Sequence, residues 1–229
     1  MANNVTNEWT APAAVLATLR TGETAVDFNT VCPMPAVLTG EPSEQVKDLA
    51  RLAMGFVTLE DLQRPTPDPH AAFLRGDYSE ACQRLEQQIF QDLLRDGPRV
   101  KDLDDADFAA WLQCCRALKE TGYPSWYEWN RAYWGTKWNA YAITVISPTV
   151  VVFQTAWNPP LMVLRALAVR HPGNAIHAAW ADEDAGSNTG ELIIAADGAI
   201  TGGAYAANSP EALALATRLL SSEKEVLEC

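Results

Sequence analysis

Hydrophobic positions along the chain follow two periods, one typical of strands and one typical of helices. Between about residues 138 and 205, short runs rich in Val, Ile, Thr and aromatic residues are separated by turn signals such as Ser147-Pro148 and Asp197-Gly198. This pattern predicts strands joined in hairpins. Helical spacing follows Asn158-Pro159-Pro160 and Ser209-Pro210, where Asn or Ser is suited to cap a helix and Pro to its first turn. This half of the chain therefore predicts the order β-β-α-β-β-β-α.

The first forty residues predict a strand, a helix and a second strand. Val5–Thr10 is rich in strand formers, and Pro12 opens a helix that ends near Gly22. Ala25–Val31 alternates sufficiently to predict the second strand. The prolines of Cys32-Pro33-Met34-Pro35 then force an extended exit from it.

Residues 41–133 carry helical spacing instead. Ser43 is suited to cap a helix that continues to about Met54. Another apolar stripe predicts a helix from Ser79-Glu80 to Gly97, and Asp104 or Asp105 starts the next. Together these patterns predict an α+β fold of the ferredoxin-like kind, with a mostly antiparallel sheet and helices on one face. The sheet domain comprises residues 1–40 and 134–229, and residues 41–133 form a helical insertion.

Composition narrows the class of protein. With 48% hydrophobic and 20% charged residues the chain is typical of a soluble globular protein. It contains no apolar run long enough to span a membrane and no signal peptide, so we expect a cytoplasmic protein of a bacterial host. The net charge of −12 disfavours phosphate contacts with nucleic acid and favours association with basic surfaces.

The cysteines and histidines indicate no metal, cofactor or disulfide framework. The five cysteines have no regular spacing, and the adjacent Cys114 and Cys115 lie in an apolar helical run that predicts burial. The three histidines are too dispersed to form a zinc site.

Several motifs resemble a phage- and plasmid-borne family with a YubB-type ferredoxin-like domain. The resemblance covers roughly residues 5–205 and rests on these segments in the same order: Asp27–Pro35 (DFNTVCPMP), Tyr127–Asn130 (YEWN), Trp134–Tyr141 (WGTKWNAY), the TAW-x-PP block ending at Pro160, and Asp182-Glu183. It implies a mobile-element protein without an established enzymatic activity. Such acidic proteins often block host defences, including CRISPR–Cas complexes.

Two groups of residues are candidates for binding a partner. The first consists of carboxylates that would pair with Lys and Arg of a host protein or imitate DNA phosphates: Asp102, Asp104, Asp105, Asp107, Asp182, Glu183 and Asp184. These carboxylates also have a structural interpretation, because carboxylates favour helix N-termini and polar turns.

The second group lies in the tryptophan-rich stretch from Tyr123 to Pro160, which holds five of the eight tryptophans. Its members would line a groove that stacks on a base and reads its edge: Trp134, Lys137, Trp138, Asn139, Trp157 and Asn158. The structural alternative is that the tryptophans fill the interface between helices and sheet.

No residue set predicts a catalytic site. Gly198, Gly202 and Gly203 do not form a phosphate-binding fingerprint, and no Ser, His and Asp are arranged as a triad. A hydrolase using Asp182 and Glu183 is the weakest alternative. The leading hypothesis is a non-enzymatic protein that binds and blocks a host protein, and the runner-up is a nucleic-acid or nucleotide-binding module.

Overall fold

The computed structural model describes residues 3–22, 25–57 and 100–227. The chain divides into two compact units, one of residues 1–34 and 127–229 and one of residues 35–126. We call them the sheet unit and the helical unit. Both boundaries lie earlier in the chain than expected from the sequence.

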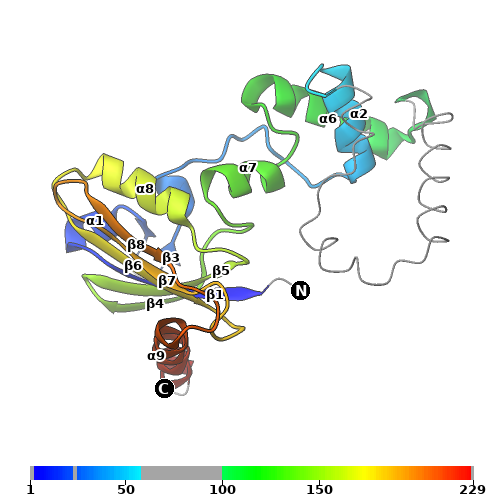
Figure 1. Cartoon of the computed structure of the whole chain (residues 1–229). Helices are drawn as coiled ribbons and strands as arrows, with labels where there is room; N and C mark the ends of the chain where they lie inside the picture. Colours follow the sequence, from blue (N-terminus) through cyan, green and yellow to red (C-terminus); the bar gives the residue numbers. More distant parts are fainter. Residues whose placement is uncertain (1–2, 23–24, 58–99, 228–229) are drawn as a thin grey trace, which may run out of the picture. The chain divides into compact units, whose positions relative to one another are not determined.

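A six-stranded antiparallel sheet forms the centre of the sheet unit, with strand order β4-β5-β1-β6-β7-β8 (Figure 1). The strands are β1 Asn4–Thr10, β4 Tyr141–Ser147, β5 Val150–Ala156, β6 Ile176–Asp182, β7 Gly190–Ile194 and β8 Ile200–Ala204. The two hairpins predicted from Ser147-Pro148 and Asp197-Gly198 are both present. The predicted α+β, ferredoxin-like fold with a mostly antiparallel sheet is therefore confirmed.

Aromatic side chains fill one face of the sheet. Trp9 of β1 meets Phe153 of β5 edge to face with ring centres 5.2 Å apart, and Phe28 lies 5.9 Å from Phe153. Because neighbouring strands share one face at paired positions, Trp180, which pairs with Asn7, belongs to this face too. Helix α8 (Leu161–Arg170) covers this face (Figure 1).

The placement of the helices differs from the prediction in one detail, because the sheet carries helices on both faces. Helix α9 (Pro210–Leu227) lies on the face opposite α8 (Figure 1). There Ala179 and Ala181 of β6 pack against Ala216 and Leu219 of α9. The alternation of small alanines with Trp180 along β6 lets one strand accept a helix closely on one side and an indole ring on the other.

The predicted strand over Ala25–Val31 is wrong beyond its first two residues. Strand β3 is Ala25–Val26 and pairs with β2, Arg20–Thr21, in a separate two-stranded sheet that follows the short helix α1, Ala13–Ala17. A 3-10 helix, η1 (Phe28–Thr30), comes next because Asp27 accepts a hydrogen bond from the backbone N–H of Asn29 at 2.9 Å. Such local side-chain bonds compete with strand pairing.

Helix α8 begins later than its sequence signals predict. We expected Asn158 to cap it, but the helix starts at Leu161 with Pro160 at the cap position and no side-chain cap. A residue that precedes proline is disfavoured in the helical conformation, so Pro159 cannot continue a helix into Pro160. Asn158 is left exposed.

Both edge strands of the sheet are irregular. Strand β4 carries two shifts of register against β5, and β8 contains Gly202 with a φ of 88°. Bulges and kinks of this kind discourage edge-to-edge pairing between molecules.

The described part of the helical unit contains α2 (Glu44–Ala53), α6 (Asp105–Thr121) and the 3-10 helix η2 (Val100–Asp102). Its core is Val46 and Ala50 of α2 against Cys114 and Leu118 of α6, so the predicted burial of Cys114 is confirmed. As predicted, the Ser43 hydroxyl accepts a hydrogen bond from the N–H of Val46 at the start of α2. The helix expected over residues 79–97 lies outside the described residues.

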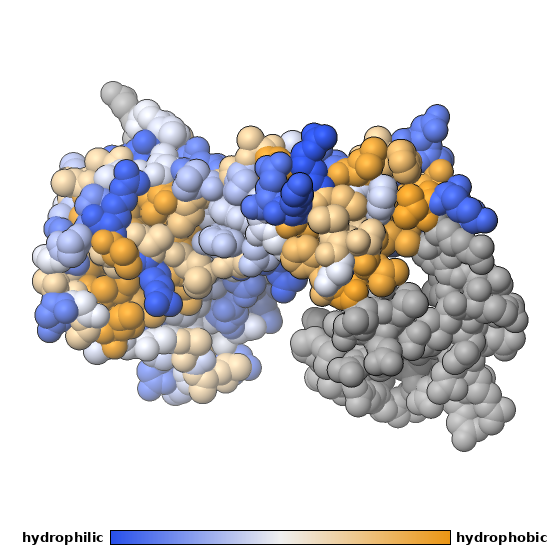
Figure 2. Space-filling view, turned by 90° about the horizontal axis from the view of Figure 1, so that it is seen from above, coloured by the Kyte–Doolittle hydropathy of each residue, from blue (hydrophilic) through white to orange (hydrophobic). Residues whose placement is uncertain are grey.

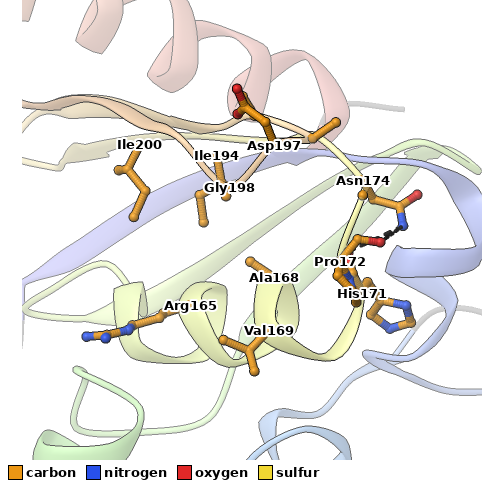
Figure 3. Close-up of a pocket in the computed structure, with 13 residues that line it drawn as sticks. Arg165, Ala168, Val169, His171, Pro172, Asn174, Ile194, Asp197, Gly198 and Ile200 are labelled. Atoms are coloured by element: carbon orange, nitrogen blue, oxygen red, sulfur yellow. Dashed lines mark hydrogen bonds between the residues drawn. The ribbon is translucent and has the colours of Figure 1, made fainter.

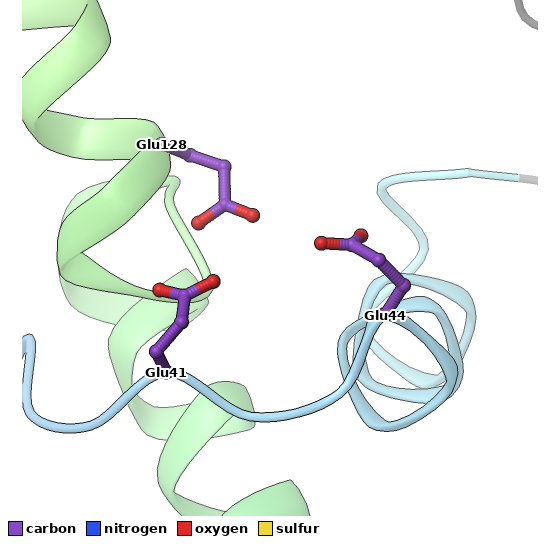
Figure 4. A group of neighbouring side chains, drawn as sticks. All are labelled: Glu41, Glu44 and Glu128. Atoms are coloured by element: carbon purple, nitrogen blue, oxygen red, sulfur yellow. The ribbon is translucent and has the colours of Figure 1, made fainter. Parts of the chain in front are cut away.

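A buried lysine is paired within the helical unit. Lys47 is 1% exposed and forms ion pairs with Glu41 and with Glu44, the latter at 2.8 Å. Figure 4 shows Glu41 on the segment before α2 and Glu44 at the start of that helix. The pairing gives these two carboxylates a structural role, because an unpaired buried ammonium is costly.

Candidate binding surface

Trp134, one of the predicted groove residues, belongs to the core of the sheet unit. It is 3% exposed, and its indole Nε1–H donates a hydrogen bond of 2.9 Å to the carbonyl of Cys32. Its ring meets those of Phe28 and Trp129 edge to face, with ring centres 5.7 Å apart in each pair. The expectation that Trp134 lines an open groove is therefore wrong.

Asn139 is also structural. Its Oδ1 accepts the backbone N–H of Phe28 at 2.9 Å, and its Nδ2–H donates to Oδ1 of Asp27 at 2.7 Å. Burial raises the pKa of Asp27, but the hydrogen bonds from Asn139 and Asn29 outweigh it, so the pKa lies below its ordinary value. Asn139 thus connects the segment before β4 to the 3-10 turn rather than facing a ligand.

Three other residues of the stretch come together at the surface around the ammonium of Lys137. Its Nζ lies 4.7 Å from the ring centre of Trp138, 4.6 Å from that of Trp157 and 5.7 Å from that of Tyr127. Trp138 is 42% exposed. We call Tyr127, Lys137, Trp138 and Trp157 the Lys137 aromatic surface. Each cation–π contact of this kind is worth about 0.5–2 kcal/mol, depending on solvent exposure.

The backbone around these residues holds them in place. The amide of Asn130, a buried residue of α7 (Trp126–Tyr133), donates to the carbonyl of Lys137 at 2.9 Å. Trp157 has a φ of 72°, in the left-handed region, and its carbonyl accepts a 2.9 Å hydrogen bond from the amide of Asn188. A bulky residue in this region costs of order 1–3 kcal/mol, and such strain is frequent at functional sites.

Sequence reasoning grouped Lys137, Trp138 and Trp157 correctly but missed Tyr127. Tyr127 meets Trp157 edge to face at 6.2 Å, across thirty residues of sequence. Arg131, one helical turn after Tyr127, lies 5.5 Å from its ring. Asn158 is exposed beside Trp157 and has no contact with Lys137 among those seen in the described residues.

The carboxylates of residues 102–107 are exposed in the helical unit, and one of them caps a helix. Asp104 accepts the backbone N–H of Asp107 at 2.8 Å and is the N-cap of α6. Asp105 and Asp107 lie in the first turn of α6, and Asp102 ends η2. These positions stabilise the helix dipole and leave the oxygens at the surface.

The second acidic group, after β6, contains one buried and two exposed members. Asp182 is 5% exposed, and its Oδ1 accepts hydrogen bonds from the Asn3 amide and the Asp184 N–H. Asp182 therefore organises the turn and is not available as a surface contact, contrary to expectation. Glu183 and Asp184 are exposed, and Glu183 accepts from the amide of Asn4.

A polar cluster that the sequence did not predict lies on the face of the sheet shared with α9. Glu191 accepts from the Tyr205 hydroxyl at 2.7 Å and lies 3.3 Å from His177 Nε2. The hydrogen bond from Tyr205 holds the pKa of Glu191 below its ordinary value, and the same bond raises the pKa of Tyr205. The three groups satisfy one another on an open surface.

A pocket of about 310 Å³ lies between the C-terminal half of α8 and the β7–β8 hairpin (Figure 3). Arg165 marks one end and His171 with Asn174 the other, and Val169 and Ile200 flank it with exposures of 76% and 61%. Figure 2 views this side of the sheet unit and shows hydrophobic residues interspersed with hydrophilic ones. The pocket is open and mostly apolar, which favours contact with an apolar group.

The sheet with α8 and α9 defines a ferredoxin-like domain. Residues 133–218 match the family model described as the ferredoxin-like domain in Api92-like protein. A crystal structure of Api92 from Yersinia pseudotuberculosis is similar with a TM-score of 0.39 and 11% sequence identity, covering 91% of this chain and 100% of that one. No curated protein shows a significant match. The YubB-type assignment and a phage or plasmid origin stay predictions.

No helix within residues 3–22, 25–57 and 100–227 has both the length and the apolar character that spanning a membrane requires.

Proposed function

We propose that this protein binds a macromolecular partner without catalysing a reaction, and that the Lys137 aromatic surface makes the central contact. The observation that supports this most strongly is the exposure of Trp138, at 42%, with the Lys137 ammonium against its ring. Trp and Tyr supply large contact areas at low entropic cost and are enriched among the residues that dominate binding energy. A rigid aromatic surface of this kind is suited to recognition.

A binding role without catalysis agrees with the hydrogen bonds that several carboxylates make within the fold. Asp27 and Glu191, whose pKa values are lowered, are hydrogen-bonded to neighbours within the sheet unit. Asp182 is occupied in a turn, which leaves the proposed hydrolase pair with Glu183 alone at the surface. Polar groups committed to the fold in this way are not poised for acid–base chemistry.

The preferred partner is a protein with a basic surface. The net charge of −12 accelerates encounter with such a surface. In the helical unit, the exposed Asp102, Asp105 and Asp107 are candidates for a separate contact with Lys and Arg of such a partner. A host defence complex as partner is the prediction that follows from the resemblance to mobile-element proteins.

Affinity capture from bacterial lysate tests this proposal. The bait would be the wild-type chain, Trp138→Ala, and Ile146→Ala as a matched control, because Ile146 is 54% exposed on β4 outside the aromatic surface. We expect wild type and Ile146→Ala to retain the same partner at low salt, and Trp138→Ala to retain at least tenfold less. Capture of nothing by wild type, or equal capture by all three, contradicts the proposal.

A second candidate function is binding of single-stranded nucleic acid or a nucleotide. It is favoured by the position of Lys137 between the rings of Trp138 and Trp157, since a base can stack on an aromatic ring while an ammonium contacts phosphate. The net charge opposes it. Fluorescence anisotropy of a labelled single-stranded 20-nucleotide oligomer, titrated with wild type and with Lys137→Ala, separates the two functions. If the anisotropy stays flat up to high micromolar protein, binding of nucleic acid is eliminated.

A further inference from the structure

The three rings around Lys137 come from three separate segments of the sheet unit. Tyr127 lies in α7, Trp138 precedes β4 and Trp157 follows β5. The rings of Tyr127 and Trp157 stand nearly perpendicular to each other, with an interplanar angle of 85°. All three ring centres lie between 4.6 and 5.7 Å from the Nζ of Lys137. They therefore form an aromatic cage around one ammonium group, the arrangement with which proteins recognise methylated lysine and quaternary ammonium ions.

Hydrogen bonds of the backbone hold the walls of this cage. The N–H of Trp157 donates to the carbonyl of Asn3 at 2.9 Å. The hydroxyl of Thr136 donates to the carbonyl of Ala156 at 2.8 Å. This second bond connects the residues that directly precede Lys137 and Trp157. The walls are therefore preorganised, which lowers the entropic cost of binding a cation between them.

The ammonium that occupies the cage is held less firmly than the walls. In the part of the chain that the structure describes, the Lys137 ammonium contacts the three rings and makes no ion pair or hydrogen bond. It stands on a flexible four-carbon stem and is strongly hydrated in water. Lys137 can therefore leave the cage for solvent without disturbing the rings.

We propose that the cage binds a lysine or arginine side chain of the partner protein, and that Lys137 occupies the cage as a competitor while the protein is free. This inference rests on the proposed function, because the same surface makes the contact. It also explains how an acidic protein with a net charge of −12 uses a surface that carries a lysine to bind a basic partner. The incoming cation replaces the Lys137 ammonium, which moves into water and no longer repels it.

Titration with tetramethylammonium chloride at constant ionic strength tests the cage on the full chain without a partner. This probe is a compact cation that donates no hydrogen bond, and neopentyl alcohol is a neutral molecule of similar shape. The indole N–H signals of Trp138 and Trp157 in heteronuclear NMR spectra measure binding. In Lys137→Ala, whose cage is empty, we expect the cation to bind at least threefold more tightly than the alcohol. Equal affinities, or no shift of either signal by the cation, overturn the cation site.

Three variants show whether Lys137 competes for the cage. Lys137→Ala should bind the cation at least threefold more tightly than wild type, because the internal competitor is gone. Trp138→Ala removes one wall and should bind at least threefold more weakly than wild type. Lys119→Ala is the matched control, since it removes the charge of an exposed lysine on α6 and should leave the affinity unchanged. No gain in Lys137→Ala, or an equal gain in Lys119→Ala, overturns the competition.

Capture of the partner from bacterial lysate extends the test to a macromolecule. We expect Lys137→Ala to retain more of the partner than wild type at the same salt concentration. Equal or lower capture overturns the proposal, and lower capture would show that the ammonium itself contacts an anionic group. The two measurements also separate this inference from the proposed function. Absence of any captured partner contradicts the proposed function, whereas a failed cation titration beside capture that still depends on Trp138 contradicts only the cage.

Discussion

The tryptophan-rich stretch contains two groups of residues with opposite environments. Trp134 and Asn139 are joined to the 3-10 turn at residues 27–30 by hydrogen bonds and ring contacts. Lys137 and Trp138, between them in sequence, lie at the surface, where the Lys137 ammonium contacts the rings of Trp138, Trp157 and Tyr127. Two tryptophans four positions apart, Trp134 and Trp138, therefore serve the core in one case and a candidate binding surface in the other.

The difference shows that residue type alone does not assign function. A tryptophan in the core is recognised by its partners, such as the carbonyl of Cys32 for Trp134. A tryptophan at a binding surface keeps part of its ring in water, as Trp138 does. The two groups should separate cleanly in experiments that measure stability and binding side by side.

The largest effect should come from Trp134→Ala. Loss of a buried indole leaves a cavity and removes the hydrogen bond to Cys32, so we expect about 3–5 kcal/mol less free energy of unfolding. Urea unfolding monitored by circular dichroism measures this. A loss below about 1 kcal/mol would place Trp134 outside the core and break the comparison.

The next effect should come from Asn139→Ala. The substitution removes one acceptor and one donor and leaves the N–H of Phe28 unpaired, which costs about 1–3 kcal/mol. The same urea titration applies. Asn158→Ala is the matched control, because the exposed amide of Asn158 should contribute little to stability.

The pH dependence of stability tests the role of Asp27. Its pKa is lower in the folded state, so its contribution is present above the ordinary value of about 3.9 and is lost as the pH falls through the folded value. Between pH 5 and 2 the free energy of unfolding should therefore fall less steeply in Asp27→Asn than in wild type. Identical slopes would show that Asp27 titrates alike in both states.

The smallest effect on stability should come from the surface group. Trp138→Ala should lower the free energy of unfolding by less than about 1 kcal/mol, since it removes one exposed cation–π contact. Partner capture should nevertheless fall in this variant. A large loss of stability in Trp138→Ala would move this residue into the structural group.

The sequence predicted those parts of the fold that depend on local signals, such as turn residues and helix caps. The hairpin turns, the caps Ser43 and Ser209, and the strand-forming runs between residues 138 and 205 all appear in the structure. The second strand was not predictable, because Asp27 and Asn29 bond to nearby backbone groups and turn the chain before it can pair. The start of α8 was misplaced because two successive prolines shift the first helical position.

The candidate sites were predictable as groups of residue types but not in their membership. The sequence by itself determined an acidic protein with an antiparallel sheet, a helical insertion and an aromatic stretch beside the sheet, because period, turn chemistry and charge are local properties. The tertiary structure decided that Trp134, Asn139 and Asp182 are buried and that Tyr127 joins Lys137. These outcomes depend on contacts between residues far apart in the chain, which no local pattern encodes.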